Sequence, residues 1–393
     1  MYYRPTYAEI NLKNLEFNFK QIKKKISKKT KILAAVKANA YGHGSKEVAK
    51  RLVKIGVDYL GVACVDEALI LRQEKQLKTV PILVLGAVLG KPEIKAALNA
   101  DITLTVTDYK NARFIQKQAC SLKQKAKVHI KIDTGMGRLG LWHTSAFNEV
   151  YKISKLKKLN LEGIYTHFPC ADTDMLFTQR QLSSFAQLLR RLQQHGIIIP
   201  IVHAANSIAI FNLNQFKNLK RTKNNCLNFL NFLNMVRPGI MLYGLMPNTN
   251  PTLKRQLKIK IKPVLSLKTK ITYLKDVTQG RSISYGATYR TQKKTKIATI
   301  PIGYADGYVR SLSNKSYVLI KGKFFPVVGR ICMDQTMIDL KNSPKICLGD
   351  TVTLIGRQKK HSIGVEQLAA ISQTIPYEIT SLISSRVPRV FIK

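Results

Sequence analysis

Residues 31–37 read KILAAVK, a short run of apolar and β-branched residues that ends on a lysine. Such a run is typical of a strand buried on both faces of a parallel sheet. The loop ANAYGHG follows directly at 38–44. Functional residues of α/β barrels lie at the carboxyl ends of the strands, so this strand and its terminal lysine predict both a fold and a site.

Seven more runs of this kind follow, and most are separated by segments with helical periodicity such as 45–55 and 178–194. Strands alternating with helices predict parallel pairing through crossover helices. The eight expected strands are 31–37, 58–63, 81–86, 102–106, 128–133, 161–167, 198–204 and 234–240. Their number favours an α/β fold of the (β/α)8 barrel type over an open doubly wound sheet.

The pattern changes after residue 260, where short strand-like runs follow one another closely and a single helix is expected near 364–372. This predicts a second, mostly β domain. We therefore expect residues 1–12 to form a strand that pairs with the β domain, 13–259 the barrel, and 260–393 the β domain. The expected strands of the β domain are 264–275, 283–289, 296–302, 316–321, 325–332, 335–340 and 350–355. The Asn-, Lys- and Phe-rich stretch 212–233 is interpreted as an insertion between strands seven and eight.

The chain is strongly basic, with 65 Lys and Arg against 22 Asp and Glu and a formal net charge of +43 over 393 residues. A nucleic-acid partner is one interpretation of this charge. However, the basic residues are spread along the whole chain, without a nucleic-acid-binding motif or a basic arm. We therefore expect a solvated lysine-rich surface and no specific nucleic-acid partner, although the positive field should attract anionic ligands.

The six cysteines are scattered and form no CxxC or Cys/His pattern. This favours free thiols in a reducing compartment and no metal site. The first residues contain no signal-peptide core, and no apolar run approaches the ~20 residues of a membrane span. The sequence thus predicts a cytoplasmic protein that does not contact membranes.

Polar residues fall where the expected barrel strands end, and together they would surround one mouth. A lysine desolvated there, such as Lys37, can act as a Schiff-base amine. Ser207 and the turn around Gly239 follow strands seven and eight, where barrels often bind phosphate. This combination suits a phosphorylated aldehyde cofactor. The residues at the mouth are Lys37, Lys131, Asp133, Arg138, His167, His203, Asn206, Ser207, Arg237 and Gly239.

Nine motifs, in order along nearly the whole chain, resemble those of alanine racemases. They are AVKANAYGHG (35–44), KIDTGMGRLG (131–140), THF (166–168), HAANS (203–207), RPGIMLYG (237–244), SYGATY (284–289), PIGYADGY (301–308), GRICMDQ (329–335) and YEITSLISSRVPR (377–389). The resemblance implies racemisation of alanine between its L and D forms, with pyridoxal 5′-phosphate as cofactor. It also implies a role in supplying D-alanine for peptidoglycan.

The resemblance implies two bases, one on each face of Cα. Lys37 would bind the cofactor aldehyde and act as one base, and Tyr285 would reach the site from the partner subunit of a homodimer. A phenol with a pKa near 10 needs cationic neighbours to act as a base, and His167 and Arg237 are the expected ones. Arg237 would face the pyridine nitrogen and, because it cannot accept a proton, leave that nitrogen unprotonated. His203 would orient Arg237.

Further roles follow from the same resemblance. Arg138 would bind the cofactor's phenolic oxygen and the substrate carboxylate, and the Met333 N–H would be a second carboxylate donor. Lys131 corresponds to a lysine that is carbamylated in many members. The expected phosphate ligands are Tyr41, Ser207, Gly239, Ile240 and Tyr377. Tyr304 and Tyr377 would narrow the entrance, with Asp172, Arg310 and Arg330 outside it, so a small substrate is expected.

Other functions remain open at this point. A broad-specificity amino-acid racemase would share all of these motifs. A pyridoxal-phosphate decarboxylase would favour a carboxylate over Arg237 at the ring nitrogen and would not need Tyr285. A non-catalytic cofactor-binding protein would typically be a lone barrel, and a nucleic-acid-binding protein is supported by charge alone. The spacing from Ser207 to Arg237 is longer than the family pattern, which leaves the placement of Arg237 to be tested.

Overall fold

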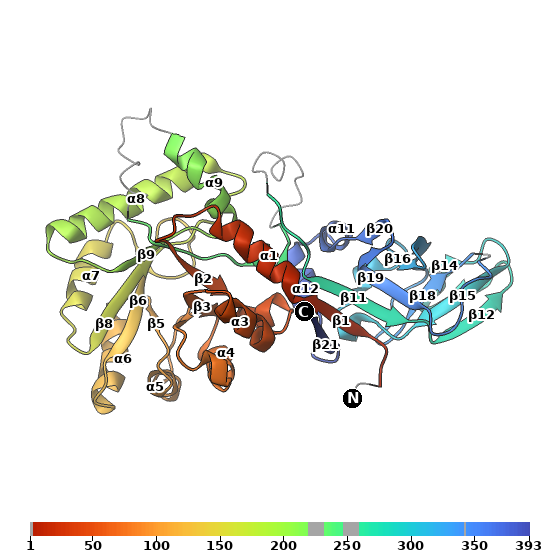
Figure 1. Ribbon diagram of the computed structural model, residues 1–393, viewed down its shortest axis with the longest axis horizontal. Coiled ribbons are helices and arrows are strands. Elements are labelled where there is room, and N and C mark those ends of the chain that lie inside the picture. The colour runs from red at the N-terminus through yellow and green to blue at the C-terminus, as the bar shows by residue number, and fades with distance from the viewer. Residues whose placement is uncertain (1–2, 219–231, 247–258, 342) are drawn as a thin grey trace.

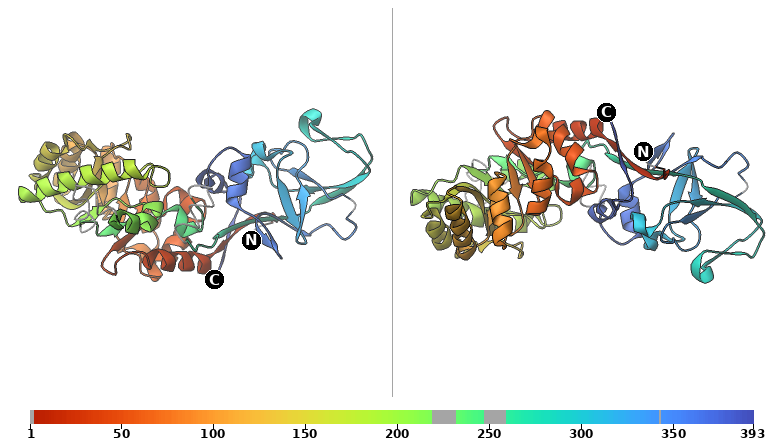
Figure 2. Two further views of the ribbon diagram at one scale, coloured as in Figure 1. Left: turned by 90° about the horizontal axis from the view of Figure 1, so that it is seen from above. Right: turned by 90° about the horizontal axis from the view of Figure 1, so that it is seen from below.

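The computed structural model describes residues 3–218, 232–246, 259–341 and 343–393. A barrel formed by the N-terminal part of the chain lies beside a β domain formed by the C-terminal part (Figure 1). The views from above and below place the two at opposite ends of an elongated molecule (Figure 2). Of the expected insertion, residues 219–231 lie outside the described ranges.

The barrel contains eight parallel strands within the described ranges, in the order β4-β3-β2-β10-β9-β8-β6-β5. The remaining gap, between β4 and β5, is bridged by a parallel pair, Leu83 with Thr103. The prediction of a (β/α)8 barrel is therefore confirmed. The strands are β2 (Lys31–Ala35), β3 (Tyr59–Val62), β4 (Ile82–Val84), β5 (Leu104–Val106), β6 (Ala126–Asp133), β8 (Leu159–Tyr165), β9 (Ile201–His203) and β10 (Met235–Val236).

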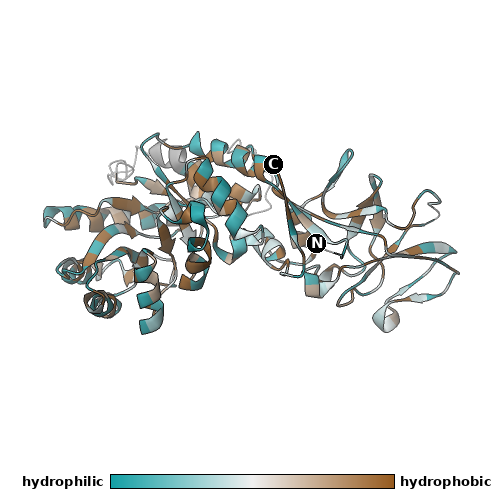
Figure 3. Ribbon diagram, turned by 60° about the horizontal axis from the view of Figure 1, so that its bottom comes forward, coloured by the Kyte–Doolittle hydropathy of each residue, from teal (hydrophilic) through white to brown (hydrophobic). Residues whose placement is uncertain are grey.

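Helices surround these strands and bury their apolar faces against them. Every residue of β3, β4 and β5 is buried, as expected for strands covered on both faces. In Figure 3 the barrel strands are mostly brown, whereas the helices mix teal and brown along their lengths. The helices are α1 (Leu12–Lys23), α3 (Ser45–Lys54), α4 (Val65–Arg72), α5 (Lys91–Asn99), α6 (Tyr109–Ser121), α7 (Ala146–Ser154), α8 (Met175–Gln194) and α9 (Ser207–Asn218).

The β domain contains a sheet in the order β17-β16-β19-β11-β1-β21, together with a sheet of β12, β15 and β18 and a hairpin of β13 and β14. The first strand, β1, pairs with β11 and β21 and leads directly into α1 of the barrel. The elements are β1 (Tyr7–Asn11), β11 (Leu265–Lys270), β12 (Tyr273–Val277), β13 (Ser282–Ile283), β14 (Tyr289–Arg290), β15 (Thr295–Ile300), β16 (Tyr317–Ile320), β17 (Lys323–Pro326), β18 (Thr336–Asp339), β19 (Thr351–Gln358), β20 (His361–Ile363), α11 (Val365–Ile371), α12 (Pro376–Ser381) and β21 (Arg389–Ile392).

Four expected strands differ from the structure. The run 264–275 is divided into β11 and β12, and only 325–326 of the run 325–332 lie in a strand, β17. The run 234–240 forms a strand only at Met235–Val236, because the Pro238–Gly239 turn ends the pairing. The run 283–289 is not one strand, because a turn at Tyr285–Ala287 separates β13 from β14. Within the described part of the chain, no helix is both long and apolar enough to cross a membrane.

Candidate active site

A cavity of ≈ 620 Å³ lies at the carboxyl ends of the barrel strands. Ile375 and Tyr377 of the β domain also line it, so both domains of one chain contribute. The sequence-predicted residues that line this cavity are Lys37, Tyr41, Lys131, Arg138, His167, Asp172, Asn206, Ser207, Arg237, Gly239, Ile240 and Tyr377. His203 is fully buried and contacts Arg237.

Lys37 does not end the strand, as the sequence suggested, but begins the short segment α2 (Lys37–Tyr41) after it. The next four residues, 38–41, have φ between 51° and 55°. This is a left-handed turn made of non-glycine residues, which costs about 1–2 kcal/mol per residue. Its presence shows that surrounding contacts outweigh that cost.

Two contacts fix this turn at its ends. The Glu67 carboxylate of α4 accepts the N–H groups of Ala38 at 2.6 Å and Ala63 at 2.7 Å. At the other end Gly42 packs so closely on the Thr380 carbonyl that a Cβ would lie 2.0 Å from its oxygen. Lys37 is therefore held between the barrel and α12 of the β domain.

The electrostatic environment lowers the pKa of Lys37 below its usual value. Burial lowers the pKa of its amine, and the positive charge of Arg138 lowers it further, whereas Glu67 acts in the opposite direction. An amine with a lowered pKa is available as a nucleophile and a base closer to neutral pH.

Arg237 is buried at the base of the cavity without a carboxylate ion-pair partner among the described residues. Its guanidinium donates to the carbonyls of Thr166 at 2.6 Å and Ala204 at 3.0 Å, and to His203 Nδ1 at 2.8 Å. Burial lowers its pKa to about 10, so it stays charged at neutral pH. The prediction that His203 contacts Arg237 is thus met by the geometry.

His167 does not have the charge expected of it. Its Nδ1 lies 3.4 Å from Arg237 Nη2, and burial together with the charge of Arg237 lowers its pKa well below the usual value. His167 is therefore neutral, with its proton on Nε2, because the guanidinium can only donate. Of the two neighbours predicted to lower the pKa of a catalytic phenol, only Arg237 carries a positive charge.

Lys131 and Asp133 project inward from the end of β6. Burial and the nearby Arg237 lower the pKa of Lys131 to about 7, and its amine donates to the Ile132 carbonyl at 2.8 Å. Burial opposes ionisation of Asp133, but the N–H groups of the 135–138 loop lower its pKa overall. Asp133 thereby fixes the loop that carries Arg138, whose N–H it accepts at 3.1 Å.

The N-terminus of α9 and the turn at Gly239 form an anion cradle. Asn206 caps α9 by accepting the Ala209 N–H at 3.1 Å, and Ser207 Oγ accepts the Gly239 N–H at 2.9 Å. A Cβ on Gly239 would lie 2.6 Å from the Tyr41 hydroxyl, so a side chain there would fill the cradle. Helix N-termini and closely approached glycine backbone are typical phosphate sites.

Five predicted residues do not line this cavity but gather on what we call the β-domain face: Tyr285, Tyr304, Arg310, Arg330 and Met333. Tyr285 is 70% exposed and Met333 53%. The Ser284 hydroxyl donates to the Arg330 carbonyl at 2.5 Å, and the Tyr304 N–H donates to the Cys332 carbonyl at 3.1 Å. The segments of Tyr285 and Arg330 are thus joined, as are those of Tyr304 and Met333, and the side chains of Tyr285, Tyr304 and Met333 are exposed.

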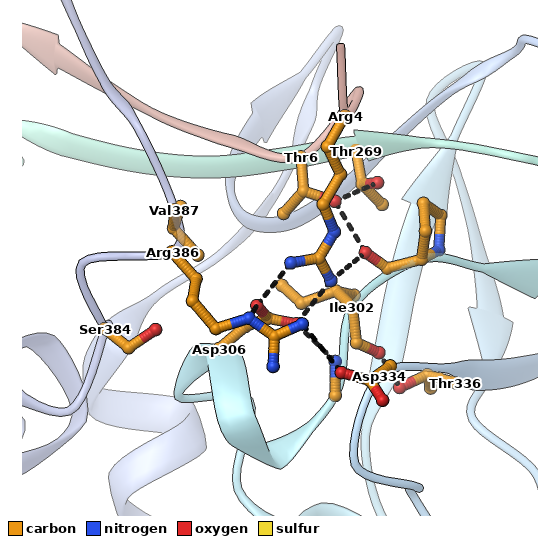
Figure 4. Close-up of polar contacts among 12 residues, drawn as sticks. Arg4, Thr6, Thr269, Ile302, Asp306, Asp334, Thr336, Ser384, Arg386 and Val387 are labelled. Carbon is orange, nitrogen blue, oxygen red and sulfur yellow. Dashed lines mark hydrogen bonds and ion pairs between the residues drawn. The ribbon is translucent and has the colours of Figure 1, made fainter. Parts of the chain in front are cut away.

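Beneath this face, a fully buried carboxylate anchors the loop that carries Tyr304. Asp306 accepts two hydrogen bonds from Arg4, at 2.5 and 2.6 Å, and lies 3.6 Å from Arg386 (Figure 4). Arg386 also pairs with Asp334 at 2.7 Å. The N-terminal segment and the C-terminal segment thus fix the neighbouring loops of Tyr304 and Met333.

Removal of Arg4 should destabilise the β domain. Asp306 is fully buried, so Arg4→Met leaves a charge without its bidentate partner, and we expect a loss of about 3 kcal/mol in the free energy of unfolding. Urea unfolding measures this. Arg386→Met is the control and should have a much smaller effect, because Arg386 is 45% exposed. Equal losses in the two variants would contradict this assignment.

Two residues of the site were not found from the sequence. Glu67 gave no signal beyond being an acid in the first turn of a helix. His129, Lys131 and Asp133 are every second residue of β6 and therefore lie on the same face of the strand. This spacing could have marked His129 as inward-facing. It is fully buried, and its Nδ1 lies 2.8 Å from His203 Nε2.

Fold and cavity together define a barrel enzyme with a reactive lysine and a site for a small anionic ligand. Comparison with known proteins specifies it further. Residues 10–247 match the model of the alanine racemase N-terminal domain, and 264–391 that of the alanine racemase C-terminal domain. Alanine racemase 2 of Caldanaerobacter subterraneus subsp. tengcongensis is 43% identical over 99% of this chain and 95% of its own length.

Two other relatives agree. The alanine racemase of Methanococcus maripaludis is 44% identical over 99% of both chains. The solved structure of the Clostridium difficile 630 alanine racemase superposes with a TM-score of 0.89 at 40% identity, covering 100% of this chain and 97% of that one. The chain belongs to the alanine racemase family, and it is an isomerase.

Proposed function

We propose that this chain racemises alanine by a two-base reaction, with Lys37 as one base and Tyr285 of the partner subunit as the other. The observation that carries the proposal is the convergence of Lys37, Arg237 and the Ser207–Gly239 cradle on one cavity, in a chain that matches alanine racemases over 99% of its length. The interconversion of L- and D-alanine would supply D-alanine for peptidoglycan.

We infer that pyridoxal 5′-phosphate is the cofactor, because the cavity fits each part of it. Lys37 would hold the aldehyde, and Ser207, Ile240, Tyr41, Tyr377 and the backbone at Gly239 would hold the phosphate. When bound, this group withdraws electrons from the amino acid attached to it and so acidifies the Cα–H bond. The protein's task is then to position the amino acid and to move protons.

Racemisation requires that a proton leave one face of Cα and that another arrive on the opposite face. Lys37 Nζ would serve one face. Tyr285 cannot serve the other within the same chain as described, because it is exposed on the β-domain face, away from the cavity lining. A homodimer that brings this face over the partner's cavity would complete the site. Each turnover leaves one base protonated and the other deprotonated, so they must exchange protons before the same direction is repeated.

Arg237 would control how strongly the site withdraws electrons. Its guanidinium would face the ring nitrogen and, since it can only donate, leave that nitrogen unprotonated. Arg138 would bind the substrate carboxylate with its planar fork, assisted by the Met333 N–H of the partner subunit.

The direct test is an assay of the purified chain. Loaded with pyridoxal 5′-phosphate, it should convert L-alanine to an equal mixture of both enantiomers, which chiral chromatography measures. Absence of D-alanine from a folded, cofactor-loaded preparation would overturn the proposal.

The entrance should favour a methyl side chain. Tyr377 lines the cavity, and Tyr304 of the partner subunit would narrow the mouth. Asp172, together with Arg310 of the partner subunit and Arg330 of the partner subunit, would form its polar rim. We expect kcat/KM for L-serine and L-lysine at least about tenfold below that for L-alanine, because each misfit of a methylene or larger group costs about 1–3 kcal/mol. Equal values for the three substrates would favour a broad-specificity racemase instead.

Lys131 should be carbamylated. A pKa of about 7 makes its amine neutral often enough to react with carbon dioxide, and the cations Arg138 and Arg237 would stabilise the resulting anion. In ¹³C-bicarbonate the wild-type chain should show a carbamate resonance that Lys131→Met lacks. In the absence of bicarbonate, the folded state binds fewer protons at Lys131 than the unfolded state between about pH 7 and pH 10.5, so the free energy of unfolding should rise with pH in that range. A spectrum unchanged by the substitution would contradict the assignment.

A further inference from the structure

Behind Arg237, a chain of hydrogen bonds runs deeper into the barrel than the proposed reaction requires. Arg237 Nη1 lies 2.8 Å from His203 Nδ1, and His203 Nε2 lies 2.8 Å from His129 Nδ1. Both histidines are fully buried. The last atom, His129 Nε2, has no hydrogen-bond partner among the described residues.

The protons of this chain have one consistent placement. Arg237 can only donate, so His203 Nδ1 accepts, and the proton of a neutral His203 must then be on Nε2. That N–H donates to His129 Nδ1, which places the His129 proton on Nε2. Burial lowers the pKa of His129 to about 3 and that of His203 well below its usual value, so both rings are neutral.

The barrel is locally shaped around His129. The pairing of β6 with β8 shifts register between Val128 and His129, and Gly163 on β8 lies opposite. A Cβ on Gly163 would lie 2.4 Å from His129 Nδ1, so only glycine leaves room for this ring. A buried N–H without a partner costs about 1–3 kcal/mol. Stability alone therefore does not account for a histidine at this position.

We propose that His129 is a positioning residue: by accepting the N–H of His203 it fixes the tautomer of His203 and thereby the orientation of the Arg237 guanidinium. Without that acceptor, His203 can place its proton on Nδ1 instead, where it faces an N–H of Arg237, and two donors repel each other. Stacking of Tyr165 on His203, with centroids 4.7 Å apart, fixes the ring plane but not the tautomer. The expected effect on catalysis rests on the proposed role of Arg237. The assignment of the His203 tautomer does not depend on that role.

The tautomers can be read directly by two-bond ¹H–¹⁵N correlation spectra of the full chain labelled with ¹⁵N-histidine. The wild-type chain should show His203 and His129 both protonated at Nε2 only, with His203→Asn and His129→Phe used to assign the signals. A wild-type His203 that is protonated at Nδ1, or at both nitrogens, would overturn the proposal whatever the variants do.

The coupling to catalysis is tested by three substitutions. His129→Phe keeps a ring and exchanges one unpaired N–H for another, so its melting temperature should stay close to that of the wild type while kcat falls by up to about 100-fold. His129→Gln keeps an acceptor and should recover part of kcat. Gly163→Ala should displace the ring and lower kcat in the same way. Tyr59→Phe, whose ring centroid lies 6.2 Å from that of His129, is the packing control and should leave kcat unchanged.

These outcomes separate the two proposals. An inactive wild type with both Nε2-protonated rings would refute the proposed function and leave the tautomer assignment intact. Full kcat in a folded His129→Phe, or a fall in kcat that follows a fall in melting temperature in all variants, would show that His129 has no positioning role. Should His129→Phe not fold, His129→Gln and Gly163→Ala decide the question by the His203 tautomer and kcat.

Discussion

A mixed dimer of Lys37→Ala and Tyr285→Phe subunits should have about half of the wild-type activity, although each variant alone is nearly inactive. In such a dimer, the intact Lys37 of one subunit meets the intact Tyr285 of the other in one site, and both defects fall in the second site. One competent site of two gives the factor of about one half for a two-fold symmetric pair. The physical reason is that Tyr285 is 70% exposed on the β-domain face and is absent from its own chain's cavity lining.

The experiment uses co-expression with two affinity tags and sequential purification of the mixed dimer. Tyr289→Phe is the matched control, since Tyr289 lies on the same hairpin but donates to Asp339 at 2.9 Å within the β domain. It should retain wild-type activity as a homodimer. An inactive mixed dimer would show that both bases come from the same chain, and a fully monomeric wild type would rule out the shared site.

The sequence predicted the barrel and the mouth because both follow from local pattern. Short β-branched runs specify buried parallel strands, and the residue after each run necessarily lies at one end of the barrel. Eight of the ten residues predicted at the mouth therefore line a single cavity: Lys37, Lys131, Arg138, His167, Asn206, Ser207, Arg237 and Gly239. The resemblance to alanine racemases added the β-domain residues, which no periodicity would have singled out.

The turn after Lys37 could not be predicted from the sequence. Positive φ is encoded locally by glycine or asparagine, whereas residues 38–41 read ANAY and are all left-handed, although only Asn39 carries such a signal. Their conformation depends on Glu67 and on Gly42 packing against Thr380, which are distant in sequence. The turn at Tyr285 is a similar case, because a strand was expected there. Gly286 is a local signal for positive φ, but Ser284 and Ala287 also have positive φ and carry no such signal. The neutral state of His167 depends on how deeply its side chain is buried, which could not be predicted from the sequence.

Replacement of Arg237 should change the reaction as well as slow it. In Arg237→Glu a fraction of reactions should release pyruvate and leave the amino group on the cofactor as pyridoxamine 5′-phosphate, so that without an added keto acid at most one pyruvate forms per site. The reason is that a carboxylate can share a proton with the ring nitrogen and would strengthen electron withdrawal beyond what racemisation needs. The deprotonated substrate would then persist long enough to be protonated elsewhere than at Cα. Racemisation itself should fall by about 100-fold or more, as expected when a preorganised charged donor is lost from a buried site.

The variant Arg237→Gln separates the effect of the side chain's charge from the effect of its lost hydrogen bonds. Both variants lose the guanidinium's bonds to the Thr166 and Ala204 carbonyls and to His203, but glutamine can still donate to the ring nitrogen and brings no proton acceptor of comparable strength. It should therefore racemise slowly without forming pyruvate. Chiral chromatography measures D-alanine, and a lactate-dehydrogenase-coupled assay measures pyruvate. Equal pyruvate yields from wild type, Arg237→Gln and Arg237→Glu would show that the group at position 237 does not select the reaction.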